Sequence, residues 1–170
     1  MQMPITNNRY LAIDRFHQLF QQGKFRSRIA TLFGSNGHLL DFEEYQPYLQ
    51  DTRHYDGVQQ IPIEHIKGSV GRVADFDNTF RPLKKYLLER WVAIALIWEQ
   101  SGWPAIQVYR LGEDYFVVDG HHRVSVARAL GIRFIDAEVW EYDLRPNTRS
   151  WRVLPGEIRL SLTTACECGD

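Results

Sequence analysis

Five consecutive residues in the second half of the chain combine anion-binding groups with a group that transfers protons. They are Asp119, Gly120, His121, His122 and Arg123, written DGHHR. Arginine presents a forked, permanently charged set of donors that suits phosphate, and histidine adds donors whose charge depends on pH. Glycine lets the backbone approach a ligand closely. The set therefore predicts an oxyanion site, with Gly120, His122 and Arg123 as binding residues.

Asp119 is the exception in this set, because a carboxylate repels phosphate. It fits three roles, namely a metal-bridging ligand, a base that accepts a hydroxyl proton, and a helix cap. The sequence leaves these roles open. It equally leaves open that one of the histidines only packs or bonds a backbone carbonyl, and that Arg123 only forms a surface ion pair.

A second cluster of polar residues lies upstream, in GSVGRVADFDNTFRP. Its two glycines and Arg72 suit a loop that lays its backbone on a phosphate, and Ser69 stands between the glycines. Asp75 and Asp77 are candidates to share Mg²⁺ if the segment is extended, although both are also ordinary turn residues. This cluster is therefore a candidate to complete the site, with Arg72 closing over the ligand.

The elements around DGHHR follow from hydrophobic periodicity. Residues 105–111 and 115–119 are strand-like and joined by a short turn. Residues 122–130 follow a helical period that ends at Gly131, and residues 133–143 alternate again like a strand. DGHHR thus lies where a strand is followed by a helix. The first N–H groups of a helix lack intrahelical partners and its dipole attracts anions, which strengthens the prediction.

The order of elements predicts an α+β domain over residues 58–145, a small mixed sheet with flanking helices. Upstream of the strands, residues 84–102 predict a long helix. Residues 58–63 read as a short strand, with Pro62 at its edge or end.

Residues 1–57 are predicted to be an N-terminal helical extension of two or three short helices. Residues 8–33 follow a helical period, which Gly23 is expected to end or bend. Asp41 is a candidate N-cap of a further helix. The extension is a candidate either to form a homodimer or to cover the site.

Residues 146–170 are predicted to be a C-terminal tail that holds one more strand. The two cysteines of the chain, Cys166 and Cys168, lie in this tail. We interpret them as plain thiols, because no other metal ligand is close to them in sequence.

The composition of this 170-residue chain limits the classes of partner that we expect it to bind. Its 20 basic and 21 acidic residues nearly cancel, so the net charge does not support DNA binding, although a local basic patch leaves DNA open. No apolar run approaches the roughly 20 residues of a membrane span. The N-terminus lacks the apolar segment of a signal peptide, so we expect no membrane partner and a cytoplasmic location.

The segment from residue 58 to residue 143 resembles the ParB/sulfiredoxin superfamily, which includes the ParB-like nuclease domains. The resemblance rests on IPIEHI, the glycine and arginine loop, a helix, SGWPAIQVYRLGEDYFVVDGHHRVSVARALG, and the strand IDAEV. Partition proteins carry G-E-R-R, whose arginines meet the phosphates of CTP; Arg123 matches the second arginine and His122 replaces the first. Sulfiredoxins carry G-C-H-R, so His122 and Arg123 match. His121 replaces their nucleophilic cysteine, which excludes sulfiredoxin chemistry.

The free serine kinases of the superfamily carry D-G-H-T-R, which is the variant most similar to DGHHR. Asp119, Gly120, His121 and Arg123 all match this motif. The resemblance implies Asp119 and His121 as catalytic residues and a nucleoside di- or triphosphate (ATP, ADP or CTP) as ligand. Mg²⁺ would lie with Asp119, Asp75 and Asp77. Glu64 joins the two upstream aspartates as a candidate for the second acidic residue of this group.

Three functions follow in order of preference. The first is a ParB-like nucleotide- or phosphate-binding module with a regulatory role. It lacks its own helix-turn-helix, because the residues after Asp143 do not read as helical. The alternative is a small-molecule phosphotransferase that uses Asp119, with positioning and charge neutralisation supplying most of the catalysis. The third is a nuclease, for which the charge balance offers neither a basic surface nor a clear metal site.

Overall fold

The computed structural model of the chain describes residues 9–34 and 37–145. The strand expected after residue 146 and the two cysteines therefore lie outside the described residues. The elements are α1 (Arg9–Leu32), β1 (Leu40–Asp41), η1 (Phe42–Glu44), η2 (Gln46–Tyr48), β2 (Leu49–Pro62), η3 (Ile63–His65), β3 (Ile66–Ser69), η4 (Lys85–Leu87), α2 (Leu88–Ser101), β4 (Ile106–Leu111), β5 (Asp114–Asp119), α3 (His121–Leu130) and β6 (Phe134–Leu144).

The strands form one mixed sheet in the order β1-β3-β5-β4-β6-β2. β3 pairs with β1 and β5 in parallel, and β4 pairs with β5 in antiparallel and with β6 in parallel. β2 runs antiparallel to β6, with Ile61 opposite Ile135. The mixed sheet with flanking helices confirms the predicted α+β class. The helix at residues 84–102 and the strands on either side of DGHHR are also confirmed, within one to three residues.

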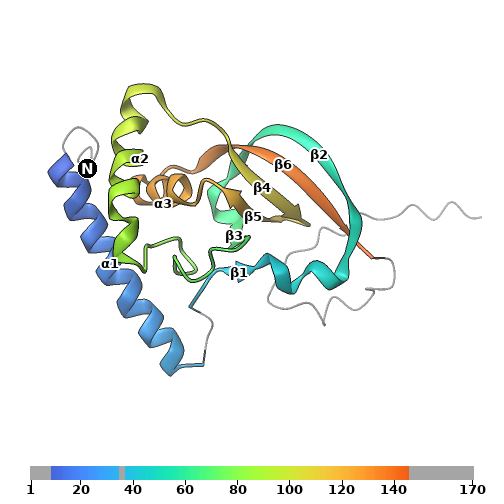
Figure 1. Cartoon of the computed structure of the whole chain (residues 1–170), viewed down its shortest axis with the longest axis horizontal. Helices are drawn as coiled ribbons and strands as arrows, with labels where there is room; N and C mark the ends of the chain where they lie inside the picture. The colour runs from blue at the N-terminus through green and yellow to red at the C-terminus, as the bar shows by residue number, and fades with distance from the viewer. Residues whose placement is uncertain (1–8, 35–36, 146–170) are drawn as a thin grey trace, which may run out of the picture.

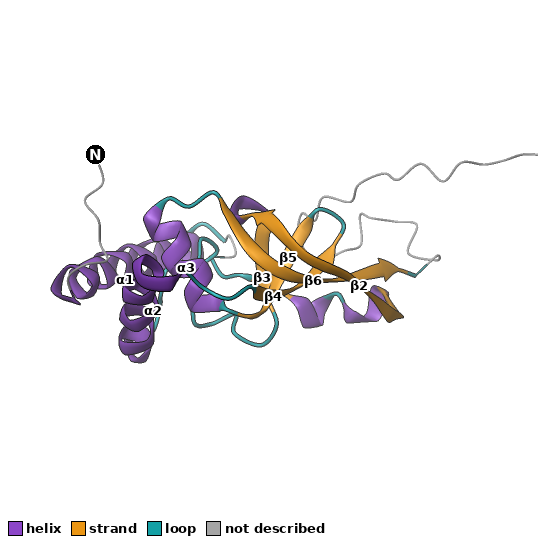
Figure 2. Ribbon diagram, turned by 90° about the horizontal axis from the view of Figure 1, so that it is seen from above, coloured by secondary structure: helices purple, strands orange, loops and turns teal. Residues whose placement is uncertain are grey.

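The helices gather on one side of the sheet, as Figure 2 shows. α3 packs on the sheet, α2 contacts α3, and α1 contacts α2 (Figure 1). The main core lies among these elements, with Trp91 of α2 fully buried. A smaller core covers the other sheet face, where Phe42 and Tyr45 of the η1–η2 segment meet Phe116 of β5.

α1 continues through Gly23, so the expectation that this glycine ends or bends the helix is wrong. Its buried residues, Ala12, Phe16, Leu19, Phe20 and Gly23, form a single stripe. A Cβ at Gly23 would lie 3.2 Å from Arg81 Cβ and 3.2 Å from the carbonyl oxygen of Pro82. The glycine therefore serves close packing against the following loop rather than a change of helix direction.

The stretch from residue 37 to residue 57 holds two short 3-10 helices and no α-helix, so the predicted helical extension is only partly right. After α1 the chain makes the short strand β1, two 3-10 turns and the first half of β2. Asp41 does act as a cap, since its side chain accepts a hydrogen bond from the N–H of Glu43 at 3.0 Å. β2 is 14 residues long, and only its end was predicted. Its first part is exposed and carries no clear alternation, so periodicity could not reveal it.

No helix among residues 9–34 and 37–145 combines the length and the apolar character that crossing a bilayer requires.

Candidate functional site

The site begins where β5 ends and α3 starts, as the sequence predicted. Gly120 is the N-cap of α3 with a φ of 103°, a value that favours glycine. A Cβ at this position would lie 2.4 Å from Ile106 Cγ2 and 3.1 Å from Arg123 Nε. Gly120 is therefore required by the turn and by close packing, and these two constraints fix the direction of the first turn of α3.

A hydrogen bond joins the two clusters that the sequence singled out. Ser69 Oγ lies 2.7 Å from His121 Nε2, and both side chains are buried. The same hydroxyl accepts the backbone N–H of Arg72 at 3.2 Å. The loop after β3 is thereby held against the N-terminus of α3, although the two residues are 52 positions apart in the chain.

Both histidines are neutral at physiological pH. The pKa of His121 is lowered to about 4, mainly by burial, with smaller contributions from the positive charges of Arg72 and His122. Burial also lowers the pKa of His122 to about 4, with the guanidinium groups of Arg90 and Arg72 adding to the effect. The imidazoles therefore offer neutral hydrogen-bonding groups rather than the pH-dependent charge that was expected from exposed histidines.

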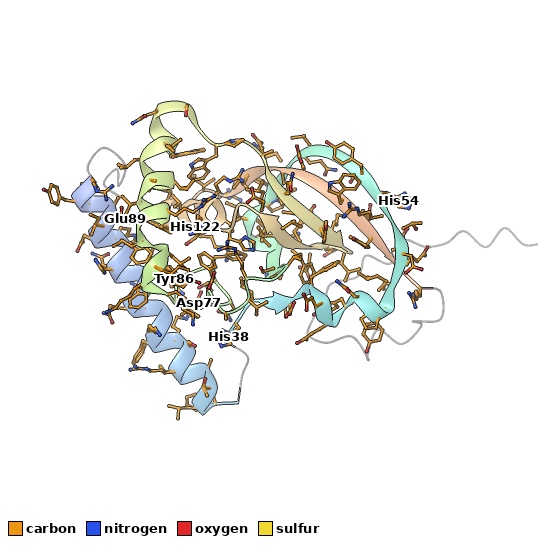
Figure 3. All side chains as sticks on the ribbon, viewed as in Figure 1. His38, His54, Asp77, Tyr86, Glu89 and His122 are labelled. Atoms are coloured by element: carbon orange, nitrogen blue, oxygen red, sulfur yellow. The ribbon has the colours of Figure 1, made fainter. Side chains whose placement is uncertain are left out.

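His122 carries an unusual polar atom. Its Nε2 is buried and makes no hydrogen bond within the described part of the chain. The ring meets Phe76 edge-on, with centroids 5.8 Å apart. Figure 3 places His122 in the same region as Asp77 and Tyr86, between the helices and the sheet, whereas His54 lies on β2 far away. An unpartnered buried nitrogen at a helix N-terminus is a candidate contact for a ligand or an ordered water.

Arg123 is engaged within the protein. Its Nη1 donates to the carbonyl oxygens of Pro104 and Ala105 at 2.7 and 2.8 Å, and its Nη2 donates to Asp119 Oδ2 at 2.5 Å. The side chain is only 12% exposed. In this arrangement Arg123 ties the start of α3 to the segment that leads into β4, and most of its donors are occupied.

Asp119 is the accessible ionisable group of the DGHHR motif. Its side chain is 61% exposed, and the ion pair with Arg123 holds it at the end of β5. Of the predicted catalytic pair, Asp119 therefore faces solvent, while His121 is buried and bonded to Ser69.

The two upstream aspartates have different surroundings. Asp77 is buried, and its Oδ1 accepts hydrogen bonds from Thr79 N, Thr79 Oγ1 and Arg81 N, which organises the loop. Asp75 receives the hydroxyl of Tyr86 and an ion pair from Arg72 at 3.4 Å. The described residues contain no group of three or more metal-ligating side chains. Because Asp77 is used inside its own loop, the pair does not fit a shared Mg²⁺.

Three residues near this site were not predicted. Phe76 belongs to the main core and contacts both imidazoles, with its ring stacked on His121 at a centroid distance of 6.3 Å. Tyr86 anchors Asp75, and Arg90 contributes charge near His122. Tyr86 and Arg90 are exposed residues of the helical segment that begins at η4, and no spacing in the sequence relates them to DGHHR.

Comparisons with known proteins place the chain only loosely. No family model matches it, and no curated protein matches it. Among solved structures, it is similar to sulfiredoxin from Arabidopsis thaliana, with 22% identity over 48% of this chain and 82% of that chain, and a TM-score of 0.33. A likeness of this strength carries no argument about either the fold or the activity.

Proposed function

We propose that this chain is a ParB-like phosphate-binding module that takes a nucleoside di- or triphosphate at the N-terminus of α3. The observation that carries the proposal is the hydrogen bond between Ser69 and His121. It fastens a glycine loop to the N-terminus of α3, where the first backbone N–H groups lack intrahelical partners and attract an oxyanion. A ligand bound at this junction would contact both the loop after β3 and the N-terminus of α3, so binding would change how the two segments are held together.

Arg72 supplies the mobile positive charge in this proposal. Its side chain is 51% exposed, and the neighbouring Gly71, with a φ of 79° and open space around its Cβ position, lets the loop adjust. His122 Nε2 adds a neutral donor or acceptor. Arg123 acts as a positioning residue, because its hydrogen bonds fix the first turn of α3.

A phosphotransferase is the second candidate, and the exposure of Asp119 is the observation that favours it. Asp119 would accept the proton of an acceptor hydroxyl while the hydroxyl oxygen bonds to the terminal phosphorus and the nucleoside diphosphate leaves. His121 has no comparable access, because it is buried and bonded to Ser69. Mg²⁺ would arrive with the nucleotide, since Asp75 and Asp77 do not form a shared site.

The test is a thermal-shift panel with ADP, ATP and CTP, each with and without Mg²⁺. A ligand at 100 times its Kd stabilises the folded state by about 2.7 kcal/mol. We expect one nucleotide to raise the Tm and Arg72→Gln to weaken its binding by about tenfold, because a charge-assisted hydrogen bond is lost. Arg26→Gln is the matched control, since Arg26 is an exposed arginine of α1.

Two results would count against the proposal. One is the absence of a Tm shift with every nucleotide, and the other is equal nucleotide affinity in wild type and Arg72→Gln. Asp119→Asn separates the two candidate functions. If ADP release from ATP in the presence of free serine stops in this variant while ATP binding persists, the phosphotransferase is favoured over the module.

A further inference from the structure

A charged cavity lies toward the C-terminal end of α3. Its volume is about 510 Å³, which is within the usual range for small-molecule sites. Arg15 of α1, Thr79–Arg81, Pro62–Glu64 and Gly131–Phe134 line it together with Arg128 of α3. Along α3 its lining extends from Ser125 to the C-terminal end, and none of the DGHHR residues takes part in it.

The cavity is lined by four guanidinium groups and a single carboxylate. The arginines are Arg15, Arg81, Arg128 and Arg133, and the carboxylate belongs to Glu64, which is exposed. Asp77 reaches Arg81 from outside the cavity at 3.6 Å. The carbonyl end of α3 adds partial negative charge, but Arg15 already bonds the Ala129 carbonyl oxygen at 3.4 Å. Positive charge therefore prevails in the cavity.

These arginines retain unused donors. The Arg133 side chain makes no hydrogen bond or ion pair within the described residues, and its guanidinium lies over the Phe134 ring. Arg128 donates only through Nη2, to the carbonyl oxygens of Ile63 and Ile66 at 2.8 and 2.9 Å. Four buried polar side-chain atoms of the described chain lack a hydrogen-bond partner. Three of them belong to this neighbourhood, namely Arg15 Nε, Arg128 Nε and Asp77 Oδ2.

The positive charge of Arg128 in particular is not balanced by a hydrogen-bonded carboxylate among the described residues. Burial lowers its pKa and the Arg81 charge lowers it further, against the opposing effect of Asp77. Its hydrogen-bond partners are uncharged carbonyl groups, and its guanidinium lies over the Phe80 ring at 5.4 Å. A buried cation with neutral partners and a like charge beside it is stabilised by any anion that enters the cavity.

We propose that this cavity is a second binding site, for the phosphate groups of a small phosphate ester, held by Arg81, Arg128 and Arg133. Planar guanidinium groups suit phosphate because they bond it in a bidentate manner. Phe134, which is 46% exposed, and Pro62 supply apolar surface for the organic part of the ligand. The site differs from the one at DGHHR in every residue.

A ligand in this cavity would also fasten α1. Arg15, Leu19 and Gln22 bring α1 to the cavity wall, while the other lining residues come from the sheet domain and its loops. Phosphate binding would therefore link the helix to the domain and slow local opening of α1. A merely adventitious surface ion would leave the exchange of α1 amides unchanged.

The experiment uses inorganic pyrophosphate as the probe, with hydrogen exchange and calorimetric titration on the full chain. We expect binding, slower exchange in residues 9–23, and a loss of about tenfold in affinity in Arg133→Gln. That variant should fold normally, because the Arg133 side chain has no hydrogen-bond partner within the described residues and the substitution keeps the backbone carbonyl that accepts from Ile63 N. Arg26→Gln, on the exposed side of α1, should bind pyrophosphate like wild type.

Three outcomes would overturn the second site. They are no pyrophosphate binding, equal affinity in Arg133→Gln and wild type, and equal stabilisation by sodium chloride at matched ionic strength, which would indicate screening alone. Two further arms identify the source of the phosphate ester, and both support the site. Tighter binding of a mononucleotide indicates a metabolite, and tighter binding of a 5′-phosphorylated oligonucleotide indicates a nucleic-acid end.

Discussion

The two ends of α3 differ in how their charged and titratable side chains are balanced by the surrounding protein. At the N-terminal end, His121 and His122 are buried and neutral, and Arg123 is occupied by carbonyl groups and Asp119. At the C-terminal end, several arginines line an open cavity with a single carboxylate among them. At the N-terminal end most polar groups are packed and have hydrogen-bond partners. At the C-terminal end the positive charges of the arginines outnumber the negative charges in the cavity.

The difference shows that a motif of adjacent residues and a charged cavity are detected in different ways. The motif is visible in the sequence, whereas the cavity is visible only in the folded structure. DGHHR attracts attention because its residues are adjacent in sequence. Adjacency at the start of a helix directs side chains toward different surroundings, and here it directs two of them into the core. The arginines of the cavity come from positions 15, 81, 128 and 133. Only the fold brings them together, so no local pattern announces them.

The largest expected effect is the acid sensitivity of the N-terminal end. His121 and His122 have a pKa of about 4 in the folded state against the ordinary 6.5. The unfolded chain therefore binds more protons between these values, and stability is full above pH 6.5 and falls as the pH drops toward 4. Each histidine contributes at most about 3 kcal/mol to this loss. Urea unfolding at pH 7, 6 and 5 measures it.

If His122→Leu leaves the slope of stability against pH between 6.5 and 5 unchanged, the acid sensitivity arises elsewhere and the contrast between the two ends fails. A shallower slope in this variant assigns a share of the effect to His122.

The next largest effect tests how rigidly the first turn of α3 is set. Gly120→Ala places a methyl group 2.4 Å from Ile106 Cγ2 at a φ of 103°. We expect a loss of about 2 to 4 kcal/mol in the free energy of unfolding, from strain and overpacking together. Gly71→Ala is the matched control, because it shares a positive φ of 79° but meets open space. Equal losses in the two variants would mean that packing at Ile106 is unimportant.

Much of this fold could be predicted because its elements follow local rules. The helix over residues 84–102, the strand pair before DGHHR and the helix end at Gly131 depend on periodicity and on glycine caps. The long β2 strand escaped prediction because its stability comes from pairing with β6 rather than from its own pattern. The role of Gly23 was misjudged because the contact that requires a glycine is made by a loop some 60 residues downstream.

The features of the candidate site likewise fall into those that local sequence patterns predict and those that depend on distant contacts. The strand-to-helix junction at Gly120 could be read from sequence, and so could the grouping of Ser69 and Arg72 with DGHHR. The internal bonding of Arg123 could not, because its acceptors are backbone carbonyl groups of Pro104 and Ala105, which any residue type would supply. Burial of the histidines depends on Phe76, whose position is set by the loop fold.

A smaller effect is expected at the bond that joins the two clusters. Ser69→Ala leaves His121 Nε2 without its partner at 2.7 Å and removes the acceptor of the Arg72 N–H. We expect a loss of about 1 to 3 kcal/mol in the free energy of unfolding. A double-mutant cycle with His121→Leu isolates the pair, and a coupling energy of at least about 0.5 kcal/mol is expected. Additive effects would show that the hydrogen bond does not hold the loop to the helix.

The smallest expected effect on stability is also the sharpest test of the comparison. His122→Leu replaces a buried imidazole whose Nε2 has no partner in the described chain. Removing an unsatisfied polar atom offsets the loss of ring contacts with Phe76, so the free energy of unfolding at pH 7 should change by less than about 1 kcal/mol. Nucleotide binding at the N-terminal end should weaken, while pyrophosphate binding at the arginine cavity stays at the wild-type level. A loss above about 2 kcal/mol in urea unfolding would mean that His122 is a structural residue, and the N-terminal end would then be a packed junction without a ligand of its own.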